Sequence, residues 1–212
     1  MHVLAISQSD YAAYLDLMME VHRLRRRVFK DRLGWDVSVS GDMEIDPYDA
    51  LGPVHLVQLS EAGSVVGCVR FLPTTGPTML ANTFPALLDG GKPPRDLRVF
   101  ESSRFCVDTE RVDKSESHGL RRATGCLFAA MIEWGLTRDL SSIVTVTDTR
   151  VERILRRANW PLERIGSPKE IGSTSAVAGF LKVSETALTS VRENAGLKGP
   201  VLAFPPAQTI AA

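Results

Sequence analysis

The order of its apolar segments is the feature that most constrains how this chain can fold. Two apolar segments, 55–59 and 65–72, are separated by Glu61-Ala-Gly-Ser, which is typical of a β-hairpin. Strand-like and helical segments then alternate at 98–107, 118–137, 142–147 and 148–158. A hairpin followed by strand–helix units predicts an α/β fold, specifically a three-layer α-β-α sandwich around one mixed sheet.

The remaining segments complete this prediction. Apolar residues at helical spacing predict a first helix from about Asp10 to Asp31, which Gly34 ends. Further elements are expected as a short helix at 83–88, late strands at 162–165 and 177–183, and a last helix from Ser184. We expect one domain over residues 1–199 and a loose tail over 200–212. The arrangement resembles the N-acetyltransferase architecture more than a doubly wound nucleotide-binding fold, and GxGxxG and GxxxxGK[ST] motifs do not occur.

Composition excludes several classes of function. A formal net charge of zero over 212 residues gives no bulk attraction to nucleic acid, so no nucleic-acid partner is expected. Cys68, Cys106 and Cys126 are widely spaced, which predicts buried free thiols rather than a disulfide, a metal site or a catalytic thiol. The sequence shows neither a signal peptide nor an apolar run long enough to span a bilayer, which predicts a cytoplasmic protein without membrane insertion.

Charged and aromatic residues are concentrated in the N-terminal half, at positions where a core would normally be apolar. Arg70 lies in a strand of Val, Cys and Phe, and Glu101 and Arg104 interrupt the next strand. Each signal has an ordinary structural explanation when taken alone. Arg25 could lie on a solvated helix face, and Asp46 and Asp49 could be loop-capping acids around Pro47. Arg70 could form a structural ion pair with Glu101. Burial of either charge would require partners in any case.

Taken in order, these residues carry a family resemblance. The elements are Arg25-x-x-x-Phe29, Leu33-x-Trp35, Glu44-x-Asp46-x-x-Asp49, Gly67-x-x-Arg70-x-x-Pro73-Thr74, Phe84, Glu101-x-Ser103-Arg104-Phe105, Thr145-Val146, Glu152-Arg-Ile-Leu155 and Trp160. Their order and spacing over roughly residues 20–166 resemble the acyl-homoserine-lactone synthases, which make the quorum-sensing autoinducers of bacteria.

The resemblance implies an acyltransferase that joins S-adenosylmethionine to an acyl thioester, without a metal or a prosthetic group. The residues that it implies around the S-adenosylmethionine pocket are Arg25, Phe29, Trp35, Asp46, Asp49, Phe84 and Arg104. It further implies a charged cluster of Arg70, Glu101 and Arg104 at the pocket floor. Aromatic rings and carboxylates suit the cations of this substrate, and an arginine fork suits its carboxylate.

The chemistry requires a base but no enzyme nucleophile. The substrate amine must lose a proton before it attacks the thioester, and a carboxylate in reach can accept that proton. Glu101 is our first candidate for this base and Asp46 the second. Ring closure is intramolecular, so Ser103 is expected to position other groups rather than to form a covalent intermediate.

The acyl donor is expected on acyl carrier protein or coenzyme A, and the sequence leaves both open. Arg122-Ala-Thr-Gly125 only partly resembles the pyrophosphate loop of the acetyltransferases. Arg150, Arg153 and Arg157 share one helix face, which is either an ordinary exposed basic face or a docking patch for an acidic carrier. Thr145 matches a position that the family associates with 3-oxo acyl chains, but threonine is also common in strands.

Two other functions fit the predicted fold. One is a coenzyme A-dependent N-acetyltransferase, which would not need the constellation from Arg25 to Asp49. The other is a non-catalytic binding domain, in which we would expect the polar cluster to be degraded.

Overall fold

A mixed β-sheet forms the centre of the protein, in a computed structural model that describes residues 1–111, 119–172 and 174–206. The strands are β1 (His2–Ile6), β2 (Val39–Ser40), β3 (Met43–Glu44), β4 (Val54–Leu59), β5 (Val65–Pro73), β6 (Val99–Val107), β7 (Ser142–Asp148), β8 (Glu163–Arg164), β9 (Lys169–Ile171), β10 (Thr174–Lys182) and β11 (Leu202–Ala203). The main sheet has the order β11-β1-β4-β5-β6-β7-β10-β8, and β9 pairs with β10. The pairs β1–β11 and β6–β7 are parallel, and the other pairs are antiparallel.

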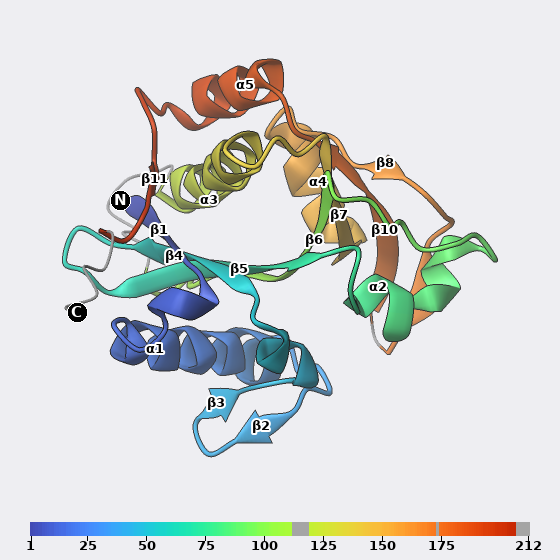
Figure 1. The fold of residues 1–212 in the computed structure, drawn as a ribbon, viewed down its shortest axis with the longest axis horizontal. Helices are drawn as coiled ribbons and strands as arrows, with labels where there is room; N and C mark the ends of the chain where they lie inside the picture. The colour runs from blue at the N-terminus through green and yellow to red at the C-terminus, as the bar shows by residue number, and fades with distance from the viewer. Residues whose placement is uncertain (112–118, 173, 207–212) are drawn as a thin grey trace, which may run out of the picture.

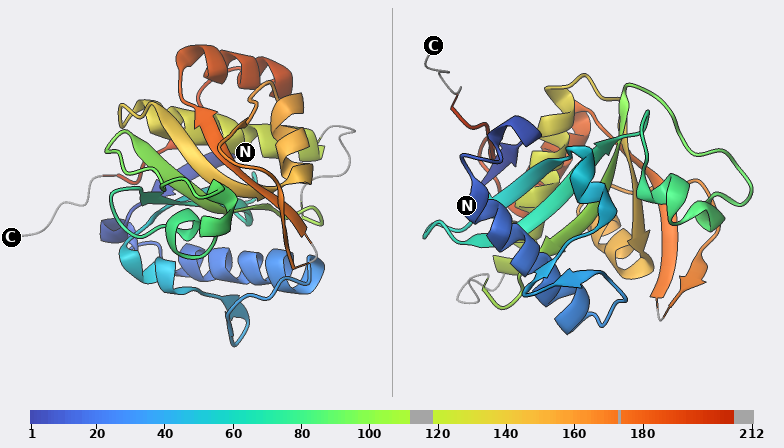
Figure 2. Two further views of the ribbon diagram at one scale, coloured as in Figure 1. Left: turned by 90° about the vertical axis from the view of Figure 1, so that its right-hand side faces the viewer. Right: turned by 60° about the horizontal axis from the view of Figure 1, so that its bottom comes forward.

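Helices cover both faces of this sheet, as Figures 1 and 2 show. The α-helices are α1 (Leu15–Arg25), α2 (Met79–Asn82), α3 (Gly119–Leu136), α4 (Thr149–Arg157) and α5 (Glu185–Ala195). Shorter helical segments are η1 (Gln8–Asp10), η2 (Arg26–Arg32), η3 (Pro47–Leu51) and η4 (Pro85–Leu88). Helix α1 lies on one face, α3 lies on the other, and α5 packs outside α3. The predicted three-layer α/β sandwich is therefore confirmed.

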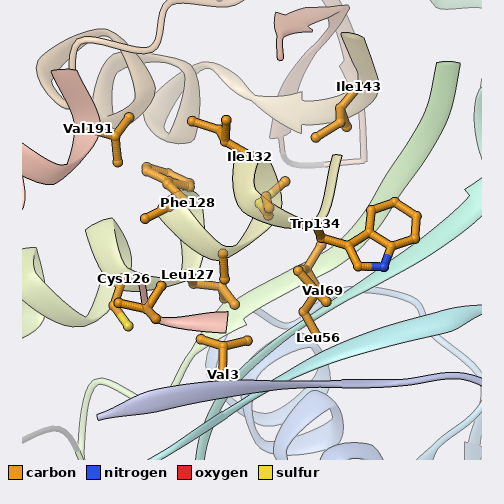
Figure 3. Close-up of a cluster of buried hydrophobic side chains, with 14 of the residues drawn as sticks. Val3, Leu56, Val69, Cys126, Leu127, Phe128, Ile132, Trp134, Ile143 and Val191 are labelled. Carbon is orange, nitrogen blue, oxygen red and sulfur yellow. The ribbon is translucent and has the colours of Figure 1, made fainter. Parts of the chain in front are cut away.

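The larger core lies between the sheet and α3 (Figure 3). Phe128, Ile132 and Trp134 of α3 pack against Leu56 and Val69 from the sheet. A second core under α1 contains Val57, Cys68 and Cys106. Because strand side chains alternate between faces, neighbouring residues of β4 and β5 contribute to different cores. The three cysteines are buried and free, as predicted.

Several elements begin or end where the sequence predicts. Asp148 caps α4 by accepting a hydrogen bond from the amide of Val151 at 2.6 Å, and Ser184 caps α5 in the same way. The first helix is less regular than expected, because its C-terminal part is the π-helical segment η2. The expected start of the long helix at residue 118 lies outside the described residues.

Other elements differ from the prediction. The expected helix at 83–88 is the shorter segment η4 (Pro85–Leu88). A separate helix that was not expected, α2, precedes it at Met79–Asn82, and Thr78 caps it. Strands β1, β2, β3, β9 and β11 were not predicted.

The expectation of a loose tail from Pro200 is wrong for its first part. Val201 is buried, and Leu202 pairs with Val3 in the parallel register of β1 and β11. The buried carboxylate of Glu133 on α3 accepts hydrogen bonds from the amides of Val201 and Leu202. Residues 207–212 lie outside the described part of the chain.

Candidate active site

A buried network of ion pairs lies on the α1 face of the sheet. Its members are Arg25, Arg70, Arg104, Glu44, Asp46 and Asp49. Arg25 donates from Nη1 and Nη2 to the two carboxylate oxygens of Asp49, at 2.7 and 2.8 Å. Its Nε donates to Glu44 at 2.5 Å. The Arg25 side chain is fully buried, so the alternative of a solvated helix face is wrong for this residue.

Arg70 and Arg104 extend the network from the sheet. Nη1 of Arg70 donates to Asp46 at 2.6 Å and to Asp49 at 2.8 Å. Nε of Arg70 donates to the hydroxyl of Ser103 at 3.1 Å. Nη2 of Arg104 lies 2.7 Å from Asp46, and its Nε donates to Glu44 at 3.0 Å. Each arginine is therefore within hydrogen-bond distance of two of the three carboxylates. Three positive and three negative groups thus balance one another away from water.

A β-bulge brings Ser103 and Arg104 to the same face of the sheet. The pairing of β5 with β6 shifts between Cys68 and Arg70, and Arg104 has a φ of 56°. Before the bulge, Ser103 faces Arg70, and after it, Cys106 belongs to the core under α1. A bulge inserts one unpaired residue, so the side chain of Arg104 joins the network instead of pointing toward α3.

Local capping places the two aspartates. Asp46 is the N-cap of η3 and accepts a hydrogen bond from the amide of Tyr48 at 2.9 Å. The carboxylate of Asp49 reaches back to the amide of Asp46 at 2.9 Å, which completes a capping box. Pro47 is in the first helical position, where its missing N–H costs nothing. The short segment therefore holds both carboxylates toward the arginines.

The electrostatics follow from burial and pairing. Burial alone raises the pKa of Asp49, but hydrogen bonds and charge from Arg25, and the charge of Arg70, outweigh it and hold the pKa well below its ordinary value. Burial lowers the pKa of Arg25, and Asp49 and Glu44 more than reverse this shift. Both partners therefore remain charged at neutral pH.

Glu101 lies on the same face but is not part of the ion-pair network. Its two oxygens accept hydrogen bonds from the amides of Met79 and Leu80, each at 2.7 Å. The carboxylates that pair with Arg70 are Asp46 and Asp49, so the alternative of an Arg70–Glu101 ion pair is wrong. Burial raises the pKa of Glu101, although the two amides and Arg70 oppose that shift.

Aromatic rings border the network. Phe29 and Trp35 stack with ring centroids 5.3 Å apart, and the guanidinium of Arg104 lies 5.6 Å from the Phe29 ring. The ring of Tyr48 lies 5.6 Å from the Arg70 guanidinium. Phe84, the remaining predicted aromatic residue, packs in a separate cluster over β7 and β10.

Two histidines lie behind the network. His55 is 1% exposed, pairs with Arg70 across β4 and β5, and has its ring 6.3 Å from that of His22. The ring of His22 hydrogen-bonds the carbonyl of Glu44 at 3.0 Å. Burial, followed by the charge of Arg25, lowers the pKa of His55 well below its ordinary value, so its imidazole is neutral.

The residues predicted to contact the acyl donor lie elsewhere. Thr145 on β7 donates to the carbonyl of Ser102 at 3.1 Å. Ile143 belongs to the core between the sheet and α3, and Val144 belongs to a cluster on the opposite face. Because side chains alternate along a strand, Thr145 lies on the same face as Ile143, toward α3. The arginines expected on one helix face are all exposed on α4, namely Arg150, Arg153 and Arg157.

The partial pyrophosphate-loop pattern lies within helix α3 itself. A Cβ atom placed on Gly125 would lie 2.4 Å from the Cβ of Ala195, so this glycine allows α5 to approach α3 closely.

Sequence reasoning did not assign four residues of this region. They are Glu44, Tyr48, His55 and Met79. Glu44 is part of the ordered motif, and its spacing with Asp46 could have identified it. A histidine in the apolar strand 55–59 was also a visible signal. Met79 has an ordinary core side chain, and nothing in its sequence context indicates a polar role.

Comparison with known proteins gives consistent results. The chain matches the autoinducer synthase family over residues 10–191. It is 48% identical over 181 residues to a probable acyl-homoserine-lactone synthase of Sinorhizobium fredii, covering 85% of this chain and 87% of the relative. It is 44% identical over 191 residues to the acyl-homoserine-lactone synthase of Agrobacterium fabrum, covering 90% of each.

Solved structures agree with these relatives. The crystal structure of the acyl-homoserine-lactone synthase LasI superposes with a TM-score of 0.80 at 37% identity, covering 90% of this chain and 94% of LasI. Two structures below 25% identity share the fold. One is the coenzyme A-dependent acyl-homoserine lactone synthase BjaI with S-adenosylmethionine and isopentyl-CoA. It superposes with a TM-score of 0.86 at 24% identity, covering 98% of this chain and 94% of BjaI. The other, from Lactobacillus plantarum, is described as an N-acetyltransferase and superposes with a TM-score of 0.55 at 14% identity, covering 87% of this chain and 100% of that protein.

Proposed function

The chain belongs to the autoinducer synthase family and is an acyl-homoserine-lactone synthase, and we propose that its buried ion-pair network is the binding site for S-adenosylmethionine. The observation that carries this proposal is the convergence of three arginines from α1, β5 and β6 with three carboxylates from β3 and the start of η3. A structural role alone would not require so many buried charges at one place.

The charge of the site complements the substrate. S-adenosylmethionine has a sulfonium, an α-ammonium and a carboxylate, so it has one net positive charge. The network is balanced in itself, and the nearby carboxylate of Glu101 adds one negative charge. The stacked rings of Phe29 and Trp35 offer aromatic faces for a sulfonium or an adenine. The site therefore matches the substrate in charge and in chemical type.

Glu101 is the better placed of the two candidate bases. Both oxygens of Asp46 are bound to arginines, so protonation of Asp46 would break ion pairs. Each oxygen of Glu101 accepts one backbone amide, and a carboxylate oxygen can accept a second hydrogen bond. Burial raises the pKa of Glu101, which makes it a stronger base than an ordinary glutamate.

The reaction then proceeds in two steps. Glu101 takes a proton from the α-ammonium, directly or through a water, and the free amine attacks the thioester carbonyl. A C–N bond forms and the thioester C–S bond breaks. The nitrogen loses its second proton to the departing thiolate, and Glu101 releases the first proton to solvent. The methionyl carboxylate next attacks its own γ-carbon and expels methylthioadenosine. Ser103 accepts a hydrogen bond from Arg70, which fits a positioning role.

The acyl donor is a thioester, and we favour acyl carrier protein over coenzyme A as its carrier. Arg150, Arg153 and Arg157 are exposed on α4, next to the strand that carries Thr145. Such a face suits the acidic surface of a carrier protein. Thr145 donates its hydroxyl to the backbone carbonyl of Ser102, so its hydrogen is already bonded within the protein. No helix within the described residues has the length and apolar character to cross a membrane, and a cytoplasmic location stays a prediction.

The carrier is tested by comparing two donors with the same acyl group. We expect Arg153→Glu to raise KM for acyl-acyl carrier protein about tenfold and to leave KM for acyl-coenzyme A unchanged. Lys182→Glu, which makes the same charge change at an exposed site on β10, is the control. If acyl-coenzyme A supports turnover and the matching acyl-acyl carrier protein does not, the preference for a carrier protein is refuted.

The function itself is tested in a heterologous bacterial host. Mass spectrometry of the culture extract should show the homoserine-lactone head group and identify the acyl tail. The purified protein with S-adenosylmethionine and an acyl donor should release methylthioadenosine. Release of coenzyme A from acyl-coenzyme A without methylthioadenosine would instead indicate an N-acetyltransferase.

A further inference from the structure

Met79 contacts both the ion-pair network and the candidate base. It is the first residue of α2 and is 7% exposed. Its backbone amide donates to Glu101 at 2.7 Å. Its thioether sulfur lies 3.3 Å from Nη2 of Arg70 and 3.6 Å from Nη1 of Arg104, and both guanidinium nitrogens donate toward it.

A thioether is an unusual acceptor for two guanidinium groups. Sulfur in methionine accepts hydrogen bonds weakly, whereas guanidinium groups bind carboxylates strongly. The other hydrogen bonds from Arg70 and Arg104 go to Asp46, Asp49, Glu44 and the hydroxyl of Ser103. Two N–H groups from two arginines therefore converge on one weak acceptor.

We propose that the Met79 thioether is a placeholder for the α-carboxylate of the substrate. This inference rests on the proposed function, because it takes S-adenosylmethionine as the ligand. The incoming carboxylate displaces the sulfur and accepts hydrogen bonds from Nη2 of Arg70 and Nη1 of Arg104. Methionine is unbranched and has three rotatable side-chain bonds, so the thioether can move while the backbone stays in place.

A substrate carboxylate at the position of the Met79 sulfur also accounts for the position of the candidate base Glu101. The carboxylate and the amine of the substrate are attached to the same α-carbon. Met79 holds Glu101 through its backbone amide while its side chain occupies the carboxylate position. A carboxylate bound there places the neighbouring amine on the side of the site where Glu101 lies.

The test compares two ligands that differ only in this carboxylate, S-adenosylmethionine and decarboxylated S-adenosylmethionine. Dissociation constants are measured by calorimetry for the wild type, Met79→Ala and Met79→Leu. Both variants remove the competing sulfur, so the preference for the carboxylate-bearing ligand should increase about threefold to tenfold. Met131→Leu, a buried methionine on α3, is the control and should leave the preference unchanged.

A purely structural role for Met79 predicts a different result. Loss of packing would weaken the binding of both ligands equally. A ratio of the two dissociation constants that stays within about twofold of the wild-type ratio would overturn the proposal. Failure of the wild type to bind S-adenosylmethionine or to release methylthioadenosine would instead refute the proposed function. The two failures are therefore distinguishable.

A second measurement uses the wild-type protein and does not depend on the folding of a variant. The chain has six methionines, whose methyl groups can be labelled with ¹³C and followed by NMR. S-adenosylmethionine should shift one buried methyl signal to the position of a mobile methionine, and decarboxylated S-adenosylmethionine should not. Identical spectra with the two ligands would overturn the proposal.

Discussion

Arg25 and Asp49 form a two-point ion pair with N–O distances of 2.7 and 2.8 Å, although they lie 24 residues apart in the sequence. Arg25 is at the end of α1, and Asp49 is in the short helix η3. The pair therefore joins the first helix to the loop that precedes β4. The Arg25 side chain is fully buried, so each of the two charges offsets the cost of removing the other from water.

Breaking this pair should destabilise the protein. Asp49→Asn keeps the shape of the side chain but leaves Arg25 and Arg70 short of one negative charge. We expect a loss of unfolding free energy on the order of 3 kcal/mol, measured by urea denaturation. Asp42→Asn is the matched control, because Asp42 pairs with Arg23 at the surface. Equal stability of the two variants would show that the network is not a stabilising unit.

Glu101→Gln should reduce kcat/KM about a hundredfold or more, because an amide cannot take the proton from the substrate amine. The wild-type rate should fall at low pH as Glu101 becomes protonated. Burial raises the pKa of Glu101, so this fall should begin above the ordinary glutamate value of 4.5. Glu152→Gln, which alters a glutamate paired with Arg164, should leave the pH profile unchanged. A Glu101→Gln variant with the wild-type profile would exclude this base.

His55 should make the protein sensitive to acid. Its folded pKa lies well below the ordinary value of 6.5, so below pH 6.5 the unfolded chain binds a proton that the folded protein does not. Stability therefore falls as the pH falls from 6.5 toward the folded pKa, by at most about 1.4 kcal/mol per pH unit. The charged and titratable groups around the ring are Arg25, Asp49, Arg70, His22 and Tyr11, and the Tyr11 ring centroid lies 5.9 Å from that of His55.

Replacing the imidazole tests this sensitivity. His55→Phe should flatten the decrease in unfolding free energy between pH 6.5 and 5, measured by denaturation at each pH. His22 keeps a smaller share of the effect, because burial also lowers its pKa. His2→Gln, at an exposed position, is the control, and its unfolding free energy should change with pH as in the wild type. An unchanged slope in His55→Phe would mean that this histidine is protonated when folded.

Gly125→Ala should destabilise the contact between α3 and α5. The added Cβ would lie 2.4 Å from the Cβ of Ala195, which forces the helices apart at a cost of about 1–3 kcal/mol. Alanine also favours helix formation, which offsets about 1 kcal/mol of that cost. The double variant with Ala195→Gly should be less destabilised than the sum of the single variants, as a double-mutant cycle would measure. Simple additivity would contradict a steric origin.

Particular residues show why prediction from sequence worked for some features and failed for others. Asp148 and Ser184 cap helices through contacts three residues away, so local sequence was sufficient to place them. Strand β11 is held by β1 and by Glu133, which are remote in sequence, and its two residues carry no periodicity to detect. Local sequence therefore predicts a loose tail from Pro200, although residues 202–203 form a strand.

The sequence predicts which residues belong to the site but not which hydrogen bonds and ion pairs they form with one another. The family resemblance included Arg70, Asp46 and Glu101, yet it suggested a cluster of Glu101 with Arg70 and Arg104. In the structure, Glu101 accepts backbone amides, and Asp46 and Asp49 bind the arginines. Phe84 was expected in the pocket and lies in another hydrophobic cluster. Choices among several possible partners depend on three-dimensional distance, which spacing along the chain does not contain.

The sequence by itself determined the class of fold, because the periodicity of apolar residues specifies which segments are strands and helices and which faces they bury. It also determined the family, through the ordered motif from Arg25 to Trp160. Only the tertiary structure decided which carboxylate meets which arginine, since that depends on the bulge at Arg104 and the capping box of Asp46 and Asp49. The physical reason is that ion pairs form across space, between groups that chain folding brings within about 3 Å of one another.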